Sequence, residues 1–86
     1  MALELEQTLY NADVVRYHRV GELEINGTLA VAVLQSYRNR EHRELPVAPV
    51  IARKFDFTFS GEPATAFAEA YAAIKALPEW SAAADV

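Results

Sequence analysis

The sequence predicts a small α+β domain, in which an antiparallel meander of three or four strands carries one C-terminal α-helix on one face. Three observations lead to this prediction. Asn26-Gly27 lies between two long runs of strand composition, which is typical of a two-residue β-hairpin turn. In residues 55–59, phenylalanine alternates with polar side chains, as in a half-buried strand. In residues 67–77, apolar side chains recur every three or four positions, which indicates a helix.

A chain of 86 residues is long enough for one hydrophobic core, so we expect a single domain over residues 1–86. Residues 1–13 are expected to form an extended edge strand or arm, and residues 81–86 a tail that either frays or docks. The absence of cysteine excludes disulfides, thiolate metal sites and cysteine nucleophiles. Without such cross-links a domain of this size has a narrow margin of stability, which makes assembly with a partner a reasonable hypothesis.

The first hairpin is expected to extend from about Val14 to Tyr37. A type I′ turn at Asn26-Gly27 places Val20 opposite Val33. One face of the hairpin then carries Tyr17, Leu23, Ile25, Ala30, Ala32 and Leu34. The other face carries Arg16, His18, Val20, Glu22, Glu24, Val31 and Val33. Because valines lie among the charges of this second face, we expect another strand or a partner subunit to cover it.

A charged segment and an apolar segment follow this hairpin. Residues 38–44 include no apolar side chain and fit a solvated tip. In residues 45–50, Pro46 and Pro49 cannot donate to a β-ladder. The apolar residues beside them must still be buried, either as a strap along a neighbouring subunit or as a loop on the chain's own sheet. The first candidate interaction patch comprises Arg38, Arg40, Arg43, Leu45, Val47 and Val50.

A further strand is expected at residues 51–59, with its phenylalanines facing the core. The helix is expected to begin near Pro63, which suits a first helical position, and to end before Pro78. Its predicted buried stripe comprises Phe67, Ala70, Tyr71, Ile74 and Leu77. Trp80 is expected to pack back on the sheet.

No set of side chains in the sequence converges on a catalytic, cofactor-binding or metal-binding site. His18 and His42 are the only histidines, and neither has a second histidine at ligand spacing. No nucleophile motif surrounds the serines, and no glycine-rich loop precedes the helix to bind phosphate. Glu22 and Glu24 share one face of a strand, which fits a cation site or, more commonly, a solvated face. We expect no enzymatic activity, cofactor, metal or small-molecule substrate.

The composition also excludes two classes of partner. The net charge of −4 opposes binding to phosphate backbones and to anionic membranes, so nucleic acid is not an expected partner. The longest stretch without a charged side chain, residues 25–37, is shorter than the roughly 20 residues that a membrane helix needs. No basic and apolar leader stands at the start of the chain, so secretion through a signal peptide is not expected.

The C-terminal segment 71–80 reads Tyr-Ala-Ala-Ile-Lys-Ala-Leu-Pro-Glu-Trp and is followed by Asp85-Val86. Together with the tyrosine-containing first strand and the Arg-Glu-His-Arg loop, it resembles short proteins encoded in the tail-gene region of bacteriophages and prophages. Those proteins often carry a Tyr-x-x-x-Lys-x-Leu-Pro-Glu-aromatic segment and a terminal Asp-Val. The resemblance implies a virion or tail-assembly role, and it transfers no functional residue.

We therefore expect a non-enzymatic phage or prophage structural or tail-assembly protein, located in the virion or the host cytoplasm. Its partners would be other phage structural proteins or copies of itself in a homo-oligomer. A second candidate patch comprises Trp80, Asp85 and Val86. The alternative is a small acidic phage-encoded inhibitor or adaptor that binds a host protein, with Glu22 and Glu24 mimicking an anionic ligand.

Overall fold

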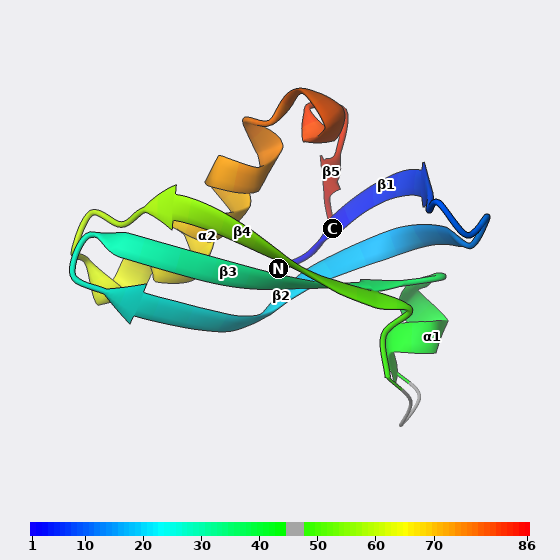
Figure 1. Cartoon of the computed structure of the whole chain (residues 1–86), viewed down its shortest axis with the longest axis horizontal. Coiled ribbons are helices and arrows are strands. Elements are labelled where there is room, and N and C mark those ends of the chain that lie inside the picture. The colour runs from blue at the N-terminus through cyan, green and yellow to red at the C-terminus, as the bar shows by residue number, and fades with distance from the viewer. Residues whose placement is uncertain (45–47) are drawn as a thin grey trace.

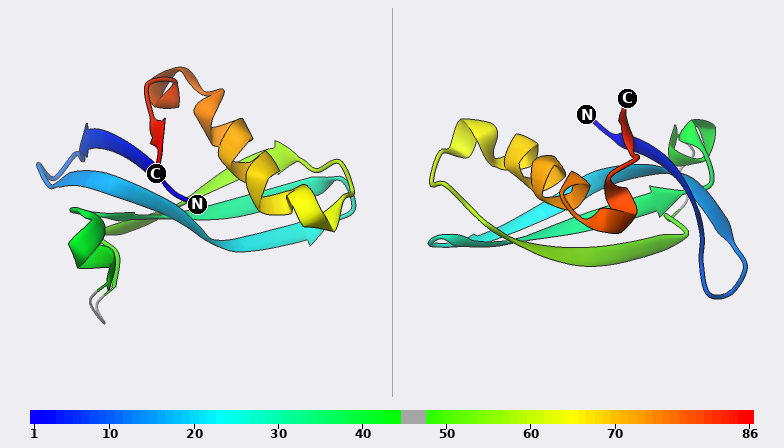
Figure 2. Two further views of the ribbon diagram at one scale, coloured as in Figure 1. Left: turned by 180° about the vertical axis from the view of Figure 1, so that it is seen from behind. Right: turned by 90° about the horizontal axis from the view of Figure 1, so that it is seen from above.

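The fold is an antiparallel sheet of five strands with one longer helix across it. The structure is a computed structural model that describes residues 1–44 and 48–86. The strands lie in the order β4-β3-β2-β1-β5 (Figure 1), and α2 crosses one face of the sheet (Figure 2). In chain order the elements are β1 (Leu3–Thr8), β2 (Val14–Asn26), β3 (Leu29–Tyr37), α1 (Arg40–Glu44), β4 (Ile51–Thr58), η1 (Pro63–Thr65), α2 (Ala66–Lys75), η2 (Pro78–Trp80) and β5 (Ala84–Asp85). The predicted α+β class and C-terminal helix are confirmed.

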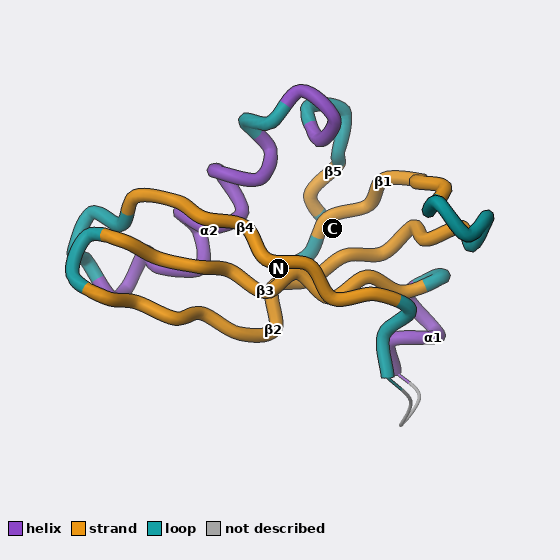
Figure 3. The backbone as a smooth tube through the Cα atoms, in the orientation of Figure 1, coloured by secondary structure: helices purple, strands orange, loops and turns teal. Residues whose placement is uncertain are grey.

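The number of strands is five instead of three or four, because both ends of the chain join the sheet. β1 pairs with β2 on one side and with β5 on the other, so the N-terminal strand is internal and not at the edge. The N–H of Val86 donates to the carbonyl oxygen of Ala2 at 3.0 Å. The C-terminal segment therefore docks beside β1 (Figure 3).

The turn between β2 and β3 lies one residue later than predicted. Its two central residues are Gly27 and Thr28, and Asn26 pairs with Leu29 across it. Gly27 has a φ of 66°, whereas Thr28 is not among the residues with positive φ. A positive φ at the first central residue alone is the pattern of a type II′ turn, which requires glycine there. The predicted type I′ turn was therefore wrong, and next to the turn each residue of β2 pairs with a residue of β3 two positions later than predicted, as Ile25 does with Ala30.

A β-bulge at Gly21 changes which side chains of β2 face the core. The pairing of β2 with β3 shifts between Val20 and Glu22, so that His18 lies opposite Ser36. Both Val20 and His18 are buried, although the predicted register placed them on the open face. A bulge adds one residue to one strand. Because successive side chains of a strand point to opposite faces, this one extra residue moves each side chain of β2 before Gly21 to the other face of the sheet.

The segment predicted as a solvated tip includes the short helix α1. The side-chain oxygen of Asn39 accepts the N–H of His42 at 2.7 Å, which caps the start of the helix. The ring of His42 packs edge-on against Tyr37, with 5.5 Å between the ring centroids. The contact with Tyr37 joins α1 to the end of β3, and α1 also lies against β2.

β4 pairs with β3 without interruption. Phe55 and Phe57 pack against the core, as their alternation predicted. The N–H of Val50, at the end of the predicted apolar arm, donates to the carbonyl oxygen of Ser36 at 2.9 Å. This end of the arm therefore joins the chain's own sheet, while residues 45–47 lie outside the described residues.

The buried stripe of α2 is confirmed at Ala70, Tyr71 and Ile74. Phe67, however, is 50% exposed, and Leu77 is 36% exposed. The α-helix begins only at Ala66, after the 3₁₀ turn η1, and Ala66 takes the buried position in the first turn, where it packs with Phe59. Leu77 lies beyond the last helical residue, Lys75. The stripe was therefore predicted too long at both ends.

The core lies between the sheet and the chain segment formed by α2 and η2 (Figure 2). Its largest fully buried side chains are Trp80, Leu3, Leu34 and Ile74, and the His18 ring packs on Trp80. Trp80 is central because its indole contacts the rings of His18 and Phe55, with centroid distances of 4.8 and 6.0 Å.

Candidate functional site

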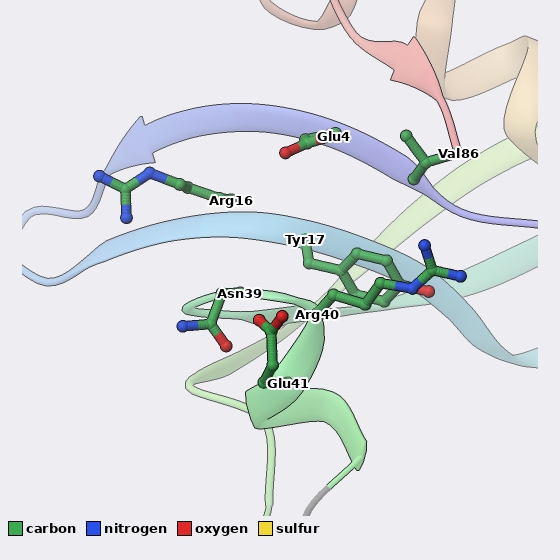
Figure 4. Close-up of a pocket in the computed structure, with 7 residues that line it drawn as sticks. All are labelled: Glu4, Arg16, Tyr17, Asn39, Arg40, Glu41 and Val86. Carbon is green, nitrogen blue, oxygen red and sulfur yellow. The ribbon is translucent and has the colours of Figure 1, made fainter.

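A pocket of about 210 Å³ opens where β1, β2, α1 and the C-terminal segment meet (Figure 4). Its lining residues are Glu4, Arg16, Tyr17, Asn39, Arg40, Glu41 and Val86. Arg16 and Val86 lie at opposite ends of it in Figure 4, and α1 forms its lower side. Segments that are far apart in the sequence therefore form one surface feature.

Strand pairing places two of these side chains next to each other. Glu4 of β1 lies opposite Tyr17 of β2, and Tyr17 lies opposite Tyr37 of β3. The rings of Tyr17 and Tyr37 are tilted by 57° with their centroids 6.4 Å apart. Because the ring of Tyr37 also packs on His42, one aromatic row connects the β2 side of the pocket to α1.

The C-terminal segment forms another wall of the pocket. Asp85 pairs with Leu3 of β1, and its carboxylate accepts a hydrogen bond from the Lys75 ammonium at 3.0 Å. Val86 is 46% exposed. The carboxylate of Asp85 is therefore used within the fold, while the aliphatic side chain of Val86 remains accessible at the pocket.

The pocket carries charges of both signs. Arg16 donates to the carboxylate of Glu6, with a shortest N–O distance of 2.8 Å. Arg40 and Glu41 contribute opposite charges from the first turn of α1. A mixed set of this kind complements a polypeptide, which presents donors, acceptors and both charges, better than it complements a phosphate group.

The residues of the two predicted patches have different locations. Arg40 and Val86 lie at the pocket, with Asp85 beside Val86 on β5. Arg38 lies 3.9 Å from the carboxylate of Asp13 in an exposed ion pair. Val50 is half-buried in the bend that precedes β4.

The prediction that Trp80 belongs to the second interaction patch is wrong. It is 1% exposed and therefore belongs to the core, because the turn η2 folds its indole onto the sheet. Leu45 and Val47 lie outside the described residues, as does the side chain of Arg43.

The sequence interpretation missed five residues of the pocket: Glu4, Arg16, Tyr17, Asn39 and Glu41. Glu4 and Tyr17 meet only because β1 pairs with β2, and no turn motif in the sequence indicated that pairing. Asn39 did carry a usable signal, since asparagine is a preferred residue at the start of a helix and could have predicted α1.

A second polar feature, the buried polar cluster of Gln7, His18, Ser36 and Arg53, lies on the α2 face of the sheet. His18 Nε2 lies 2.8 Å from the carbonyl oxygen of Leu5, which can only accept, so Nε2 carries the proton. The hydroxyl of Ser36 then donates to Nδ1 of His18 at 2.7 Å. Arg53 Nη2 donates to Ser36 Oγ at 3.0 Å and to Gln7 Oε1 at 2.9 Å.

The surroundings of His18 keep its ring neutral. Burial lowers the pKa of His18 below its ordinary value, the hydrogen bond to Leu5 opposes this shift, and the positive charge of Arg53 adds to it. Arg53 itself stacks over Trp80, with its guanidinium carbon 5.3 Å from the ring centroid. Although serine and histidine are hydrogen-bonded here, both are fully buried, so no substrate can reach the hydroxyl in this structure. The arrangement stabilises the core.

The segment that carries the phage resemblance has a structural explanation. The Tyr71 hydroxyl accepts the N–H of Val20 and donates to the carbonyl oxygen of Met1, both at 2.8 Å. Lys75 pairs with Asp85. Tyr71 and Lys75 therefore attach the helix to the two ends of the chain.

Comparisons with protein-family models, with curated proteins and with solved structures gave no match. Within residues 1–44 and 48–86, no group of three or more histidine, cysteine, aspartate or glutamate side chains is placed to hold a metal ion. No helix in the described part of the chain has both the length and the apolar composition to cross a bilayer.

Proposed function

We propose that this chain is a non-enzymatic structural or tail-assembly protein of a phage or prophage, which acts through protein-protein contacts. The observation that carries the proposal is the pocket, where Arg40 of the first candidate patch and Val86 of the second come together. One residue from each of two regions selected separately in the sequence thus lines the same exposed pocket. The resemblance of segment 71–80 to tail-region proteins supports the biological setting.

The form of the pocket favours a polypeptide partner. A volume of about 210 Å³ is below the range of roughly 300–1,000 Å³ that is usual for small-molecule sites. Opposite charges surround the aromatic ring of Tyr17, and Val86 offers an apolar contact. An aromatic centre with a charged rim is the usual composition of a protein interface.

The proposal is tested by mass spectrometry of purified virions of the source replicon, which asks whether the chain is present and in how many copies. In a virion-producing strain, Arg40→Glu should reduce incorporation about tenfold or more, because it reverses one of the charges beside the Tyr17 ring. Glu24→Lys, an exposed substitution on β2 away from the pocket, is the matched control and should leave incorporation unchanged. Absence of the wild-type chain from virions and from assembly intermediates would overturn the proposal.

The alternative, a small acidic inhibitor or adaptor, has one observation in its favour. Glu22 and Glu24 are both exposed, and they lie opposite Val33 and Val31 on the same face of the sheet. An inhibitor should copurify with one host protein at fixed stoichiometry and should be missing from virions. In that case Glu24→Lys would abolish the interaction and Arg40→Glu would preserve it.

A further inference from the structure

β4 (Ile51–Thr58) is an open edge of the sheet. It pairs only with β3, and no described element pairs with its outer side. In Figure 1 its C-terminal half forms the boundary of the molecule, and α2 passes behind the sheet. Edge strands in natural proteins are usually short, bulged, interrupted by proline or provided with charged side chains such as lysine, which prevents pairing with another chain. β4 has eight residues, a continuous register and no proline. It does carry Lys54, but Asp56 on the same face has the opposite charge.

The direction of the backbone groups of β4 follows from its hydrogen bonds. The N–H of Phe59 donates to the carbonyl oxygen of Thr28 at 2.7 Å, in line with the register that pairs Phe57 with Ala30. Because hydrogen-bonded and non-hydrogen-bonded pairs alternate in an antiparallel ladder, the odd-numbered residues of β4 bond to β3. The even-numbered residues direct their N–H and C=O groups outward, namely Ala52, Lys54, Asp56 and Thr58.

The outward-directed residues of one copy are complementary in charge to the same residues of a second copy. If a second copy pairs antiparallel along β4 with the two-fold axis at Phe55, Lys54 of each copy lies opposite Asp56 of the other. Two ion pairs then form by symmetry, and Ala52 lies opposite Thr58. The neighbouring registers place Lys54 opposite Lys54, or Asp56 opposite Asp56, and like charges directly opposite are destabilising. The charge pattern therefore selects one register.

The side chains of β4 that face the core favour the same pairing. Phe55 is only partly buried in the isolated chain. On the two-fold axis the Phe55 rings of the two copies would form a non-hydrogen-bonded pair, which has the closest side chains in an antiparallel ladder. Aromatic pairs at such positions stabilise strand association.

We infer that two copies of this chain associate through their β4 edges, antiparallel about Phe55, to form one continuous sheet. A second copy is the occupant because Lys54 and Asp56 supply both halves of the charge complementarity. The inference rests on the proposed assembly function for its biological purpose and names one contact by which copies of the chain would join. It makes no use of the pocket.

The first test measures molar mass by light scattering and dimer dissociation by analytical ultracentrifugation. The wild type should be a dimer, and Lys54→Asp or Asp56→Lys alone should raise the dissociation constant about tenfold. The double variant Lys54→Asp/Asp56→Lys should restore wild-type affinity. An equimolar mixture of the two single variants should form heterodimers, because each copy then presents one sign of charge to the other.

Two controls keep this test decisive. Glu4→Lys changes an exposed charge on β1, which is separated from β4 by β2 and β3, so it should leave the dissociation constant unchanged, and circular dichroism checks that each variant is folded. Amide exchange gives a readout that does not depend on side chains: the Lys54 and Asp56 amides should be protected only at concentrations where the dimer forms.

A monomeric wild type, or a dimer that tolerates both single reversals and leaves these amides unprotected, would overturn the inference. Its failure differs from failure of the proposed function, since a monomer could still enter virions through the pocket and a dimer could be missing from them.

Discussion

At the scale of one residue, the fold restricts the protonation state of the His18 ring. Its Nε2–H donates to the Leu5 carbonyl oxygen and its Nδ1 accepts from Ser36, so both ring nitrogens have partners in the neutral form. Protonation would direct a second donor at the Ser36 hydroxyl, which already accepts from Arg53. It would also place a positive charge beside that guanidinium, on the face where Trp80 excludes water. The neutral ring is therefore part of the stability of the fold.

This restriction predicts that the free energy of unfolding falls as the pH is lowered below about 6.5, the ordinary pKa of histidine. Because burial holds the pKa of His18 lower in the folded chain, the unfolded chain binds the proton first. The slope should be at most about 1.4 kcal/mol per pH unit between about 6.5 and the lower folded pKa, and this contribution should be constant above that window. Urea unfolding at a series of pH values measures the slope.

The matched variants for this measurement are His18→Gln and His42→Gln. His18→Gln should lose the dependence between pH 7.5 and 5.5, although it starts from a less stable protein. His42→Gln, at the surface helix α1, should keep it. Equal slopes in the wild type and His18→Gln would show that another group is responsible.

At the scale of elements, composition and period predicted which elements form, while local backbone irregularities decided which side chains they bury. The strands at Val14–Asn26 and Ile51–Thr58 and the helix after Pro63 follow from apolar periodicity and turn residues. The bulge at Gly21 could not be read from that periodicity, because both faces of β2 contain valine. It moved His18 and Val20 into the core, and the buried polar cluster therefore remained unpredicted.

The first turn of α2 gives the second testable case. Phe67→Ala should lower the free energy of unfolding by less than about 1 kcal/mol, because half of the side chain is already exposed. Ile74→Ala removes a fully buried side chain and should cost about 2–5 kcal/mol. Chemical unfolding of both variants gives the comparison. If Phe67→Ala cost as much as Ile74→Ala, the start of α2 would have to lie deeper against the sheet than it does here.

At the scale of the whole molecule, the termini decide the architecture. Sequence patterns did not predict β5, because a two-residue strand has no detectable period, and they left β1 as either an edge strand or an arm. Docking of the C-terminal segment on β1 creates one wall of the pocket. The candidate site was therefore only partly predictable: Arg40 and Val86 were selected as residues, but their proximity depends on pairing between segments distant in the sequence.

Trp80 connects these distant parts, because it packs on His18 of β2, on Phe55 and Arg53 of β4, and within the same cluster as Ile74 of α2. Trp80→Ala should lower the free energy of unfolding by about 3–5 kcal/mol, a large share of the roughly 5–15 kcal/mol available to a small domain. Unfolding must be followed by circular dichroism, since Trp80 is the only tryptophan.

The nearby Leu77→Ala, at a partly exposed position, should cost less than about 1 kcal/mol. Because the sheet and α2 still share the other buried residues of one core cluster, the protein weakened by Trp80→Ala should unfold in a single transition. A separate early loss of helix signal would show that α2 and the sheet are not one cooperative unit.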